Sequence, residues 1–131
     1  YIKQNGKPEH PKELDNHILV KSTAVSNVME WRFYNNGETL FKITPRLSVT
    51  SNDAAIEAVK NDFGITRVLS YQVAPLLASG KIQTILEEYE PEPLPVHIVH
   101  RENHLTTAKV RSFIDLMATR LKRELATIPG K

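Results

Sequence analysis

The spacing of hydrophobic residues in the first fifty positions is that of short strands. Residues 17–21 (HILVK) form an apolar run of strand length, and residues 47–49 form another. Between them, hydrophobic and polar residues alternate on both sides of Asn35-Asn36-Gly37, which supplies the positive φ angles of a tight hairpin turn. Ahead of the strands, residues 1–6 predict the end of a helix closed by a glycine, and Pro11 begins a single helical turn.

From residue 51 onward the hydrophobic spacing becomes helical. Apolar positions at i, i+1 and i+4 predict a helix over residues 53–62, and a second helix follows over residues 71–78. Their predicted N-caps and terminating glycines are Ser51 or Asn52 with Gly64 for the first helix, and Ser70 with Gly80 for the second. The strands predicted around these helices are residues 65–69, 81–86 and 96–100. Helices interleaved with strands predict an α/β fold.

The last part of the chain predicts a connector and one long helix. Residues 87–95 carry four acids and three prolines, which indicates an extended, solvated connector, because proline lacks an N–H and disfavours helix in the residue before it. A helix is predicted from about Thr106 to Ala126, and Pro129-Gly130 stop it. Its apolar stripe consists of Val110, Phe113, Ile114, Met117, Leu121 and Leu125.

Composition narrows the class of protein. The chain has 131 residues with 40% hydrophobic and 24% charged, which is ordinary for one globular domain. The net charge of +2 does not predict a binder of polyanions, and the lack of cysteine excludes disulfides and thiolate chemistry. No apolar run approaches the roughly 20 residues that span a bilayer. The chain begins at Tyr1 without Met or a signal-peptide pattern, so we expect a piece of a longer protein.

Metal, nucleotide and nucleic-acid sites are poorly supported. His97, His100 and His104 have a spacing that suggests a metal site, but on a strand residues 97 and 100 project to opposite faces, so ordinary surface histidines are favoured. No glycines stand at the spacing of a phosphate-binding loop, and no cofactor is expected. Residues 101–131 carry seven basic and three acidic side chains, but the basic residues near the helix end complement its dipole and need no nucleic acid.

Catalytic patterns are equally weak. Ser70 stands between a strand and a helix as in a nucleophile elbow, but its neighbours are Leu69 and Tyr71 instead of the motif's glycines. The acidic residues of the connector lack a rigid frame for acid–base chemistry. We therefore expect that the chain is not an enzyme.

Two strand-to-helix junctions are the best candidates for binding. Thr50, Ser51 and Asn52 lie at one of them and Ser70 lies at the other. Such junctions expose backbone N–H groups and hydroxyls that suit a carboxylate or another small polar ligand. Simple helix capping explains the same residues, and the residue pattern by itself favours capping.

Several motifs resemble the effector-binding domain of LysR-type bacterial transcriptional regulators, and among them the subgroup that includes CrgA. The segment that begins at Gly64 reads GITRVLSYQVAPLLASGKIQTIL, which is similar to that family throughout. Further similar motifs, in the family's order, are residues 10–17 (HPKELDNH), 31–33 (WRF) with Gly37, 47–53 (LSVTSND), 94–99 (LPVHIV) and 109–115 (KVRSFID). Residues 60–63 (KNDF) depart from the family, which has small, apolar residues there, so this helix end is more polar than the family's.

The resemblance implies a fold and a domain organisation. The family's effector domain has two lobes of the periplasmic-binding-protein type 2 fold, each a mixed sheet flanked by helices. By this resemblance, residues 1–101 are most of the second lobe, and residues 102–131 are a C-terminal helix that packs on the first lobe, which this chain lacks. The winged helix-turn-helix that binds DNA would also be absent.

The resemblance further implies a ligand-binding role. In the family a small-molecule co-inducer binds in the cleft between the lobes, which adds a functional reason to the junction of Thr50, Ser51 and Asn52; an anionic metabolite is one candidate class. Ser70 and Ser22 are weaker candidates. The implied protein is a cytoplasmic bacterial sensor that self-associates, contacts DNA only through its absent N-terminal domain and binds no membrane. The alternatives are a lobe of a transporter's solute-binding protein, a ligand-binding enzyme lobe of the same fold, and a pure oligomerisation module built on the stripe of the last helix.

Overall fold

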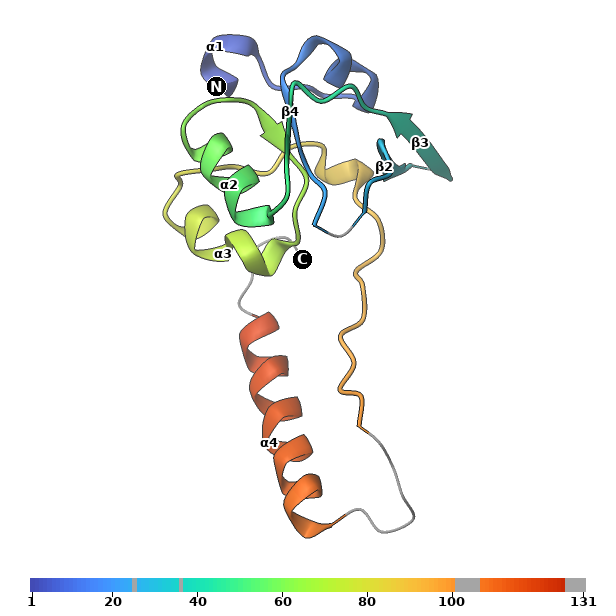
Figure 1. Cartoon of the computed structure of the whole chain (residues 1–131), viewed down its shortest axis with the longest axis vertical. Coiled ribbons are helices and arrows are strands. Elements are labelled where there is room, and N and C mark those ends of the chain that lie inside the picture. The colour runs from blue at the N-terminus through green and yellow to red at the C-terminus, as the bar shows by residue number, and fades with distance from the viewer. Residues whose placement is uncertain (25, 36, 101–106, 127–131) are drawn as a thin grey trace. The chain divides into compact units, whose positions relative to one another are not determined.

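The computed structural model describes residues 1–24, 26–35, 37–100 and 107–126. The chain divides into two compact units, one of residues Tyr1–Pro91 and the other beginning at Glu92 (Figure 1).

A parallel sheet of three short strands is the centre of the first unit. Strand β1 (Leu19–Ser22) lies between β4 (Leu47–Val49) and β5 (Ile65–Thr66), and both pairings are parallel. The register places Ser22 opposite Val49 and Leu19 opposite Ile65. The strands predicted at residues 17–21 and 47–49 are thus confirmed, whereas the one predicted at 65–69 is only two residues long.

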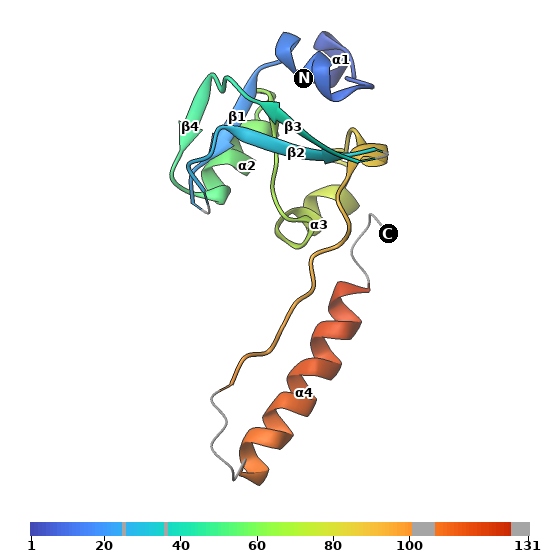
Figure 2. The ribbon, with the colours of Figure 1, turned by 90° about the vertical axis from the view of Figure 1, so that its right-hand side faces the viewer.

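The predicted hairpin forms a separate two-stranded antiparallel sheet (Figure 2). Its strands are β2 (Glu30–Tyr34) and β3 (Glu38–Lys42), and Trp31 pairs with Phe41 across them. Trp31 and Phe33 alternate with exposed residues and are buried, as a half-buried strand requires. The side chain of Arg67, just after β5, donates a hydrogen bond of 2.9 Å to the carbonyl of Arg32 and so ties the hairpin to the parallel sheet.

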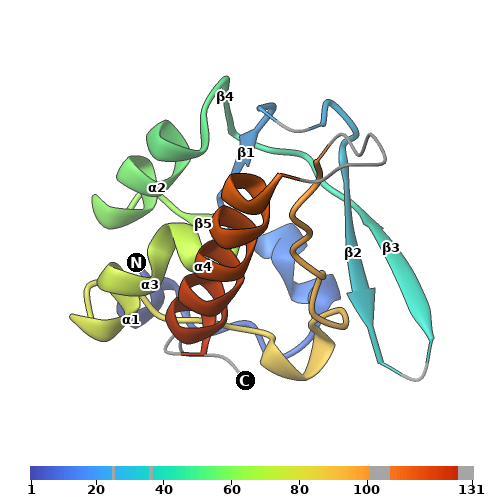
Figure 3. The ribbon, with the colours of Figure 1, turned by 90° about the horizontal axis from the view of Figure 1, so that it is seen from below.

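Short helices accompany the strands of this unit. They are α1 (Ile2–Asn5), the 3-10 helix η1 (Pro11–Asn16), α2 (Asn52–Lys60) and α3 (Ser70–Ala78), each within two residues of its predicted position. Helix α2 packs against all three parallel strands. Figures 1 and 3 show α2 and the β2–β3 hairpin on opposite sides of β1. This arrangement is the layered α/β architecture that the sequence predicts.

The hydrophobic core joins residues that are far apart in the sequence. Its buried members are Leu14, Leu19, Trp31, Phe33, Ile43, Ile65 and Leu86. Leu14 comes from η1, Trp31 and Phe33 from the hairpin, and Leu86 from the segment after α3. The core therefore connects the parallel sheet to the hairpin and to both 3-10 helices.

Two predicted strands are wrong. Residues 81–86 form no strand, because this segment pairs with no strand among the described residues; at its end Leu86 adopts a left-handed conformation (φ 58°), and a 3-10 helix η2 (Glu87–Tyr89) follows. The side chain of Leu86 is nevertheless buried in the core. Residues 96–100 are not a strand either, since this segment pairs with no other strand of the part of the chain that the structure describes, and a strand needs a hydrogen-bonded neighbour.

Gly64 has a different role from the predicted one. Helix α2 ends at Lys60 with Asn61 as its C-cap, and the left-handed residue after it is Asp62 (φ 59°). Gly64 is needed because a Cβ there would lie 2.3 Å from the carbonyl oxygen of Ile18. Asp62 stands in the stretch that departs from the family, at a conformation that favours glycine.

The second unit contains the long helix that the sequence predicts. Helix α4 spans Ala108–Leu125, and the Oγ1 of its N-cap Thr107 accepts a hydrogen bond of 3.5 Å from the N–H of Val110. Of its apolar stripe, Val110 and Phe113 are exposed to 40% and 60%, whereas Ile114, Met117, Leu121 and Leu125 are half-buried. The predicted stop at Pro129-Gly130 lies outside the described residues.

An exposed ion pair on α2 leads to a prediction about the acid titration of Glu57. Lys60 Nζ lies 2.6 Å from Glu57 Oε2, and this hydrogen bond, aided by the charge of Lys60, lowers the pKa of Glu57. The pair therefore stabilises the folded chain above the ordinary pKa of glutamate, and this contribution disappears as the pH falls through the lowered pKa. In Lys60→Gln we expect the pKa of Glu57 to rise towards its ordinary value, measured by NMR titration of the side-chain carboxyl. Lys12→Gln, a change on η1, should leave that pKa unchanged; an equal pKa in Lys60→Gln and the parent chain would contradict the assignment.

Candidate functional site

The carboxyl ends of the parallel strands bring the predicted site residues to one edge of the sheet. Strand β1 ends at Ser22, β4 at Val49 and β5 at Thr66. Because the strands are parallel, the loops that follow them leave from the same edge, the usual position of ligands in α/β sheets. Ser22 is the last residue of β1, and the predicted residues Thr50, Ser51, Asn52 and Ser70 lie in the loops after β4 and β5 or at the helix starts that follow.

The end of β1 is held to the end of β4 by Thr23. Its backbone N–H and its Oγ1 both donate to the carbonyl oxygen of Val49, at 2.8 Å and 3.1 Å. Ser22 is 9% exposed, and its Oγ accepts a hydrogen bond from the N–H of Ala24 at 3.3 Å. Thr23 is therefore fixed beside Thr50, although the sequence pattern did not single it out. The signal that could have found it is its position directly after Ser22, at the end of a buried strand.

The junction between β4 and α2 contains one capping residue and one free hydroxyl. Ser51 is the N-cap of α2, and its Oγ accepts from the N–H of Ala54 at 3.2 Å, so its predicted capping role is confirmed. Thr50 is exposed, and its hydroxyl makes none of the side-chain hydrogen bonds found among the described residues. Of the two hydroxyls, Thr50 is the one available to a ligand.

Asn52 is tied to the next helix. Its Nδ2 donates to Oε1 of Gln72 at 3.3 Å, and the same oxygen accepts from the N–H of Leu69 at 3.2 Å. The first turns of α2 and α3 are thus joined by a side-chain bridge. Gln72 was not predicted as a site residue. The sequence feature that could have indicated it is its position three residues after the helix N-cap, where a glutamine side chain accepts from the N–H of the cap residue.

Ser70 does not cap α3 as predicted. The N-cap is Leu69, Ser70 is the first helical residue, and the Oε1 of Gln72 accepts the N–H of Leu69. A glutamine at this position replaces the capping side chain that leucine lacks. The exposed Ser70 hydroxyl therefore lies at the sheet edge and does not cap the helix.

The predicted site residues and Gln72 offer neutral hydrogen-bonding groups, and Asp53 in the first turn of α2 is the acidic neighbour of Asn52. Hydroxyls of serine and threonine and the amides of Asn52 and Gln72 can hold a small polar molecule by donating and accepting hydrogen bonds. No group of three or more His, Asp or Glu side chains in the described part of the chain is arranged to hold a metal ion. His97 and His100 are exposed, and His104 lies outside the described residues, so the suggested metal site stays untested.

A charged side chain close to this edge, that of Arg67, is turned to the hairpin. Arg67 follows β5, but its guanidinium donates to the carbonyl of Arg32 and lies 6.0 Å from the ring centroid of Phe33. Burial lowers the pKa of Arg67, although an arginine stays charged at neutral pH. Arg67 therefore stabilises the fold, and its hydrogen bond is made to the hairpin.

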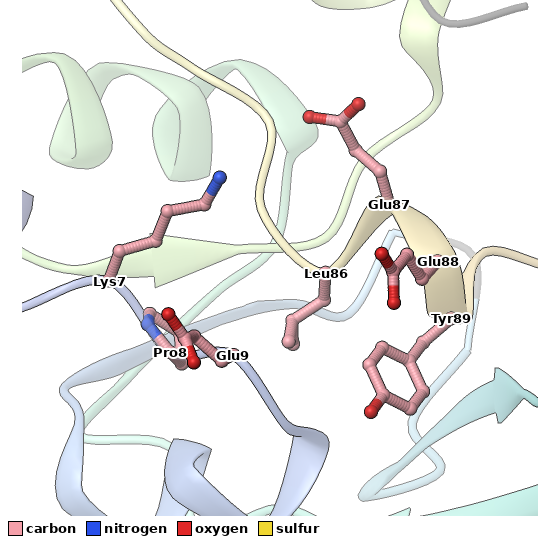
Figure 4. Close-up of a pocket in the computed structure, with 7 residues that line it drawn as sticks. All are labelled: Lys7, Pro8, Glu9, Leu86, Glu87, Glu88 and Tyr89. Atoms are coloured by element: carbon pink, nitrogen blue, oxygen red, sulfur yellow. The ribbon is translucent and has the colours of Figure 1, made fainter.

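A separate hollow of about 520 Å³ opens between the start of the chain and η2 (Figure 4). Its lining residues are Lys7, Pro8, Glu9, Leu86, Glu87, Glu88 and Tyr89. None of the five predicted site residues belongs to it. Tyr89 also meets His10 edge to face, with ring centroids 5.4 Å apart, which packs η2 against η1.

Comparison with known proteins identifies the family. Residues 2–122 match the family described as the LysR substrate binding domain, which is most of the chain. The chain belongs to the LysR substrate-binding domain family. The resemblance of its motifs to LysR-type regulators is thereby confirmed.

Individual relatives agree with this assignment. The chain is 28% identical over 120 residues to the HTH-type transcriptional regulator YcaN of Escherichia coli, covering 91% of this chain and 39% of that protein. It resembles the regulatory domain of AphB of Vibrio vulnificus with a TM-score of 0.78 and 20% identity, covering 92% of this chain and 60% of that one. It resembles the regulatory domain of CrgA of Neisseria meningitidis with a TM-score of 0.76 and 21% identity, covering 92% of this chain and 60% of that one. These structural likenesses confirm the fold of a LysR regulatory domain.

Two further observations concern the length of the chain and the hydropathy of its helices. The chain spans about two fifths of the length of YcaN, so it corresponds to a part of such a regulator. Within the residues that the structure describes, no helix is long and apolar enough to cross a membrane.

Proposed function

We propose that this chain is the small-molecule-sensing part of a LysR-type bacterial transcriptional regulator. The observation that carries the proposal is the sheet edge at which three parallel strands end, with the free hydroxyls of Thr50 and Ser70 beside the bridged amides of Asn52 and Gln72. The family match over residues 2–122 supports the sensor role, and the curated relative YcaN is a transcriptional regulator. No catalytic step is part of this function.

The effector in this proposal is a small polar co-inducer, an anionic metabolite being one candidate class. Thr50 and Ser70 provide hydroxyls that can donate or accept, and Ser22 and Ser51 line the same edge while their oxygens accept backbone N–H groups. A ligand changes the output of such a protein only if it binds one lobe arrangement more tightly than another. The bound effector would favour that arrangement and bias the attached domains.

The other partners in this proposal are those of a complete LysR-type regulator. DNA would be bound by an N-terminal domain outside this chain, and the regulator would act in the bacterial cytoplasm without a membrane partner. We keep the division at residue 101 as a proposal, with residues 102–131 packing on the first lobe of the effector domain. The exposed apolar side chains of α4 support this, because contiguous apolar surface usually marks a contact site.

Self-association is the second part of the proposal. If the stripe of α4 has no partner lobe, copies of this chain should associate through it. Sedimentation velocity from micromolar to millimolar concentration should show dimers or larger species, and Phe113→Ser, a change at a 60% exposed position, should shift the equilibrium to monomer. A monomer at all concentrations would contradict this contact.

The hydroxyl of Thr50 provides the direct test of the effector site. A thermal-shift screen of small polar metabolites on the two-lobed regulatory domain first identifies a ligand. Thr50→Val removes one hydrogen-bonding group at nearly constant volume, so we expect about tenfold weaker binding of that ligand. Calorimetry measures the affinity.

Thr39→Val is the matched control for this test. Thr39 is also exposed, but it lies in β3 of the hairpin and not at the end of a parallel strand. The affinity of this variant should equal that of the parent domain. Unchanged affinity in Thr50→Val would place the effector elsewhere.

A further inference from the structure

The side-chain bridge between α2 and α3 has a fixed hydrogen-bond polarity. Oε1 of Gln72 accepts two hydrogen bonds, from the N–H of Leu69 at 3.2 Å and from Nδ2 of Asn52 at 3.3 Å. A backbone N–H can only donate, so the oxygen of the Gln72 amide must be the atom that lies against it. The amide of Asn52 must then present its nitrogen to that oxygen.

This polarity decides which atoms remain for a ligand. The donors of Gln72 at Nε2 and the acceptor of Asn52 at Oδ1 make no hydrogen bond among the described residues. Both side chains are half-buried, so each keeps access to solvent. The Nδ2 donor of Asn52 is already used on Gln72, and Gln72 is the residue that offers a free donor at Nε2.

We infer that Gln72 is a specificity-determining residue of the proposed effector site. Its Nε2 would donate to a carboxylate or carbonyl oxygen, and the neighbouring Oδ1 of Asn52 would accept from a hydroxyl or an N–H. The matching ligand has an acceptor and a donor on adjacent atoms, as α-hydroxy carboxylates do. This inference rests on the proposed function, because it concerns the same sheet edge.

Gln72→Glu separates the ligand role of Gln72 from its structural role. A glutamate carboxylate still accepts from Leu69 and Asn52, so the bridge is kept, but the donor is lost and a negative charge replaces it. Lactate, which carries a carboxylate, should bind this variant at least tenfold more weakly. Lactamide is its neutral isostere, and its amide N–H groups can donate to the new carboxylate, so its affinity should be kept or increased.

The experiment measures the ratio of lactate to lactamide affinity by NMR titration of the two-lobed regulatory domain. We expect the ratio to fall at least tenfold in Gln72→Glu and to stay constant in Gln4→Glu, which makes the same charge change on the exposed face of α1. A purely structural role would weaken both probes equally and leave the ratio unchanged. An unchanged ratio, or no binding of lactate to the parent domain, would overturn the inference.

The outcome for Thr50 keeps the two proposals apart. If a screened metabolite binds with Thr50-dependent affinity while the ratio in Gln72→Glu is unchanged, the sensor function stands and only the role of Gln72 fails. If no screened metabolite depends on Thr50, the proposed effector site itself fails.

Discussion

Replacing Leu14 with alanine should lower the free energy of unfolding by about 2–5 kcal/mol. Leu14 is 1% exposed and belongs to the core cluster with Leu19 and Trp31. The truncation removes buried methyl groups and leaves a cavity that short, irregular η1 can only partly fill. Because native proteins have only about 5–15 kcal/mol of stability, this change should leave a substantial unfolded population.

Leu40→Ala is the matched control, since it makes the same chemical change at a position that is 55% exposed in β3. We expect a loss of under about 1 kcal/mol there. Urea unfolding followed by the fluorescence of Trp31, the single tryptophan, reports both values from the core itself. Equal losses in the two variants would show that Leu14 is not a core residue.

Replacing Gly64 with alanine should cost about 2–4 kcal/mol by a different mechanism. The new Cβ would lie 2.3 Å from the carbonyl oxygen of Ile18, and that oxygen also accepts the N–H of Ile65 at 2.9 Å. Relief of the clash must move β5 away from β1 and weaken that hydrogen bond. The damage falls on the parallel sheet whose edge holds the proposed site.

Gly80→Ala distinguishes this clash from ordinary glycine conformation. Gly80 has φ +67°, and a Cβ added there would meet nothing within 4 Å, so alanine should cost only about 1 kcal/mol through backbone strain. The same urea measurement compares the two glycines. A loss in Gly64→Ala no larger than in Gly80→Ala would show that the approach of Ile18 is not what requires glycine.

Elements with local signals were predicted correctly from the sequence. The hairpin of β2 and β3 follows from alternation around an Asn-Gly turn, and α2 and α4 follow from helical spacing and a capping serine or threonine. These signals depend on residues a few positions apart, so the sequence displays them directly. The family also follows from motif order, and residues 2–122 confirm it.

Two predicted strands that depend on distant partners were wrong. Residues 81–86 have the composition of a strand, but Leu86 turns into the core with a left-handed backbone, which no local rule anticipates for leucine. Residues 96–100 have strand-like residues and no paired neighbour in the described structure. Strand formation requires an available sheet edge, and the sequence of the strand itself does not contain it.

The candidate site divides in the same way. The sequence alone placed hydroxyls and an amide at strand-to-helix junctions, because strands, caps and helices are short-range features. Only the tertiary structure decided that Asn52 uses its donor on Gln72, twenty positions along the chain, and that Thr23 locks β1 to β4. A hydrogen bond forms between groups that are close in space. The parallel pairing of β1 with β4 and β5 brings these groups together. The sequence therefore determined the family and placed polar residues at the junctions that we propose as the binding edge, and the fold determined which of their atoms remain free.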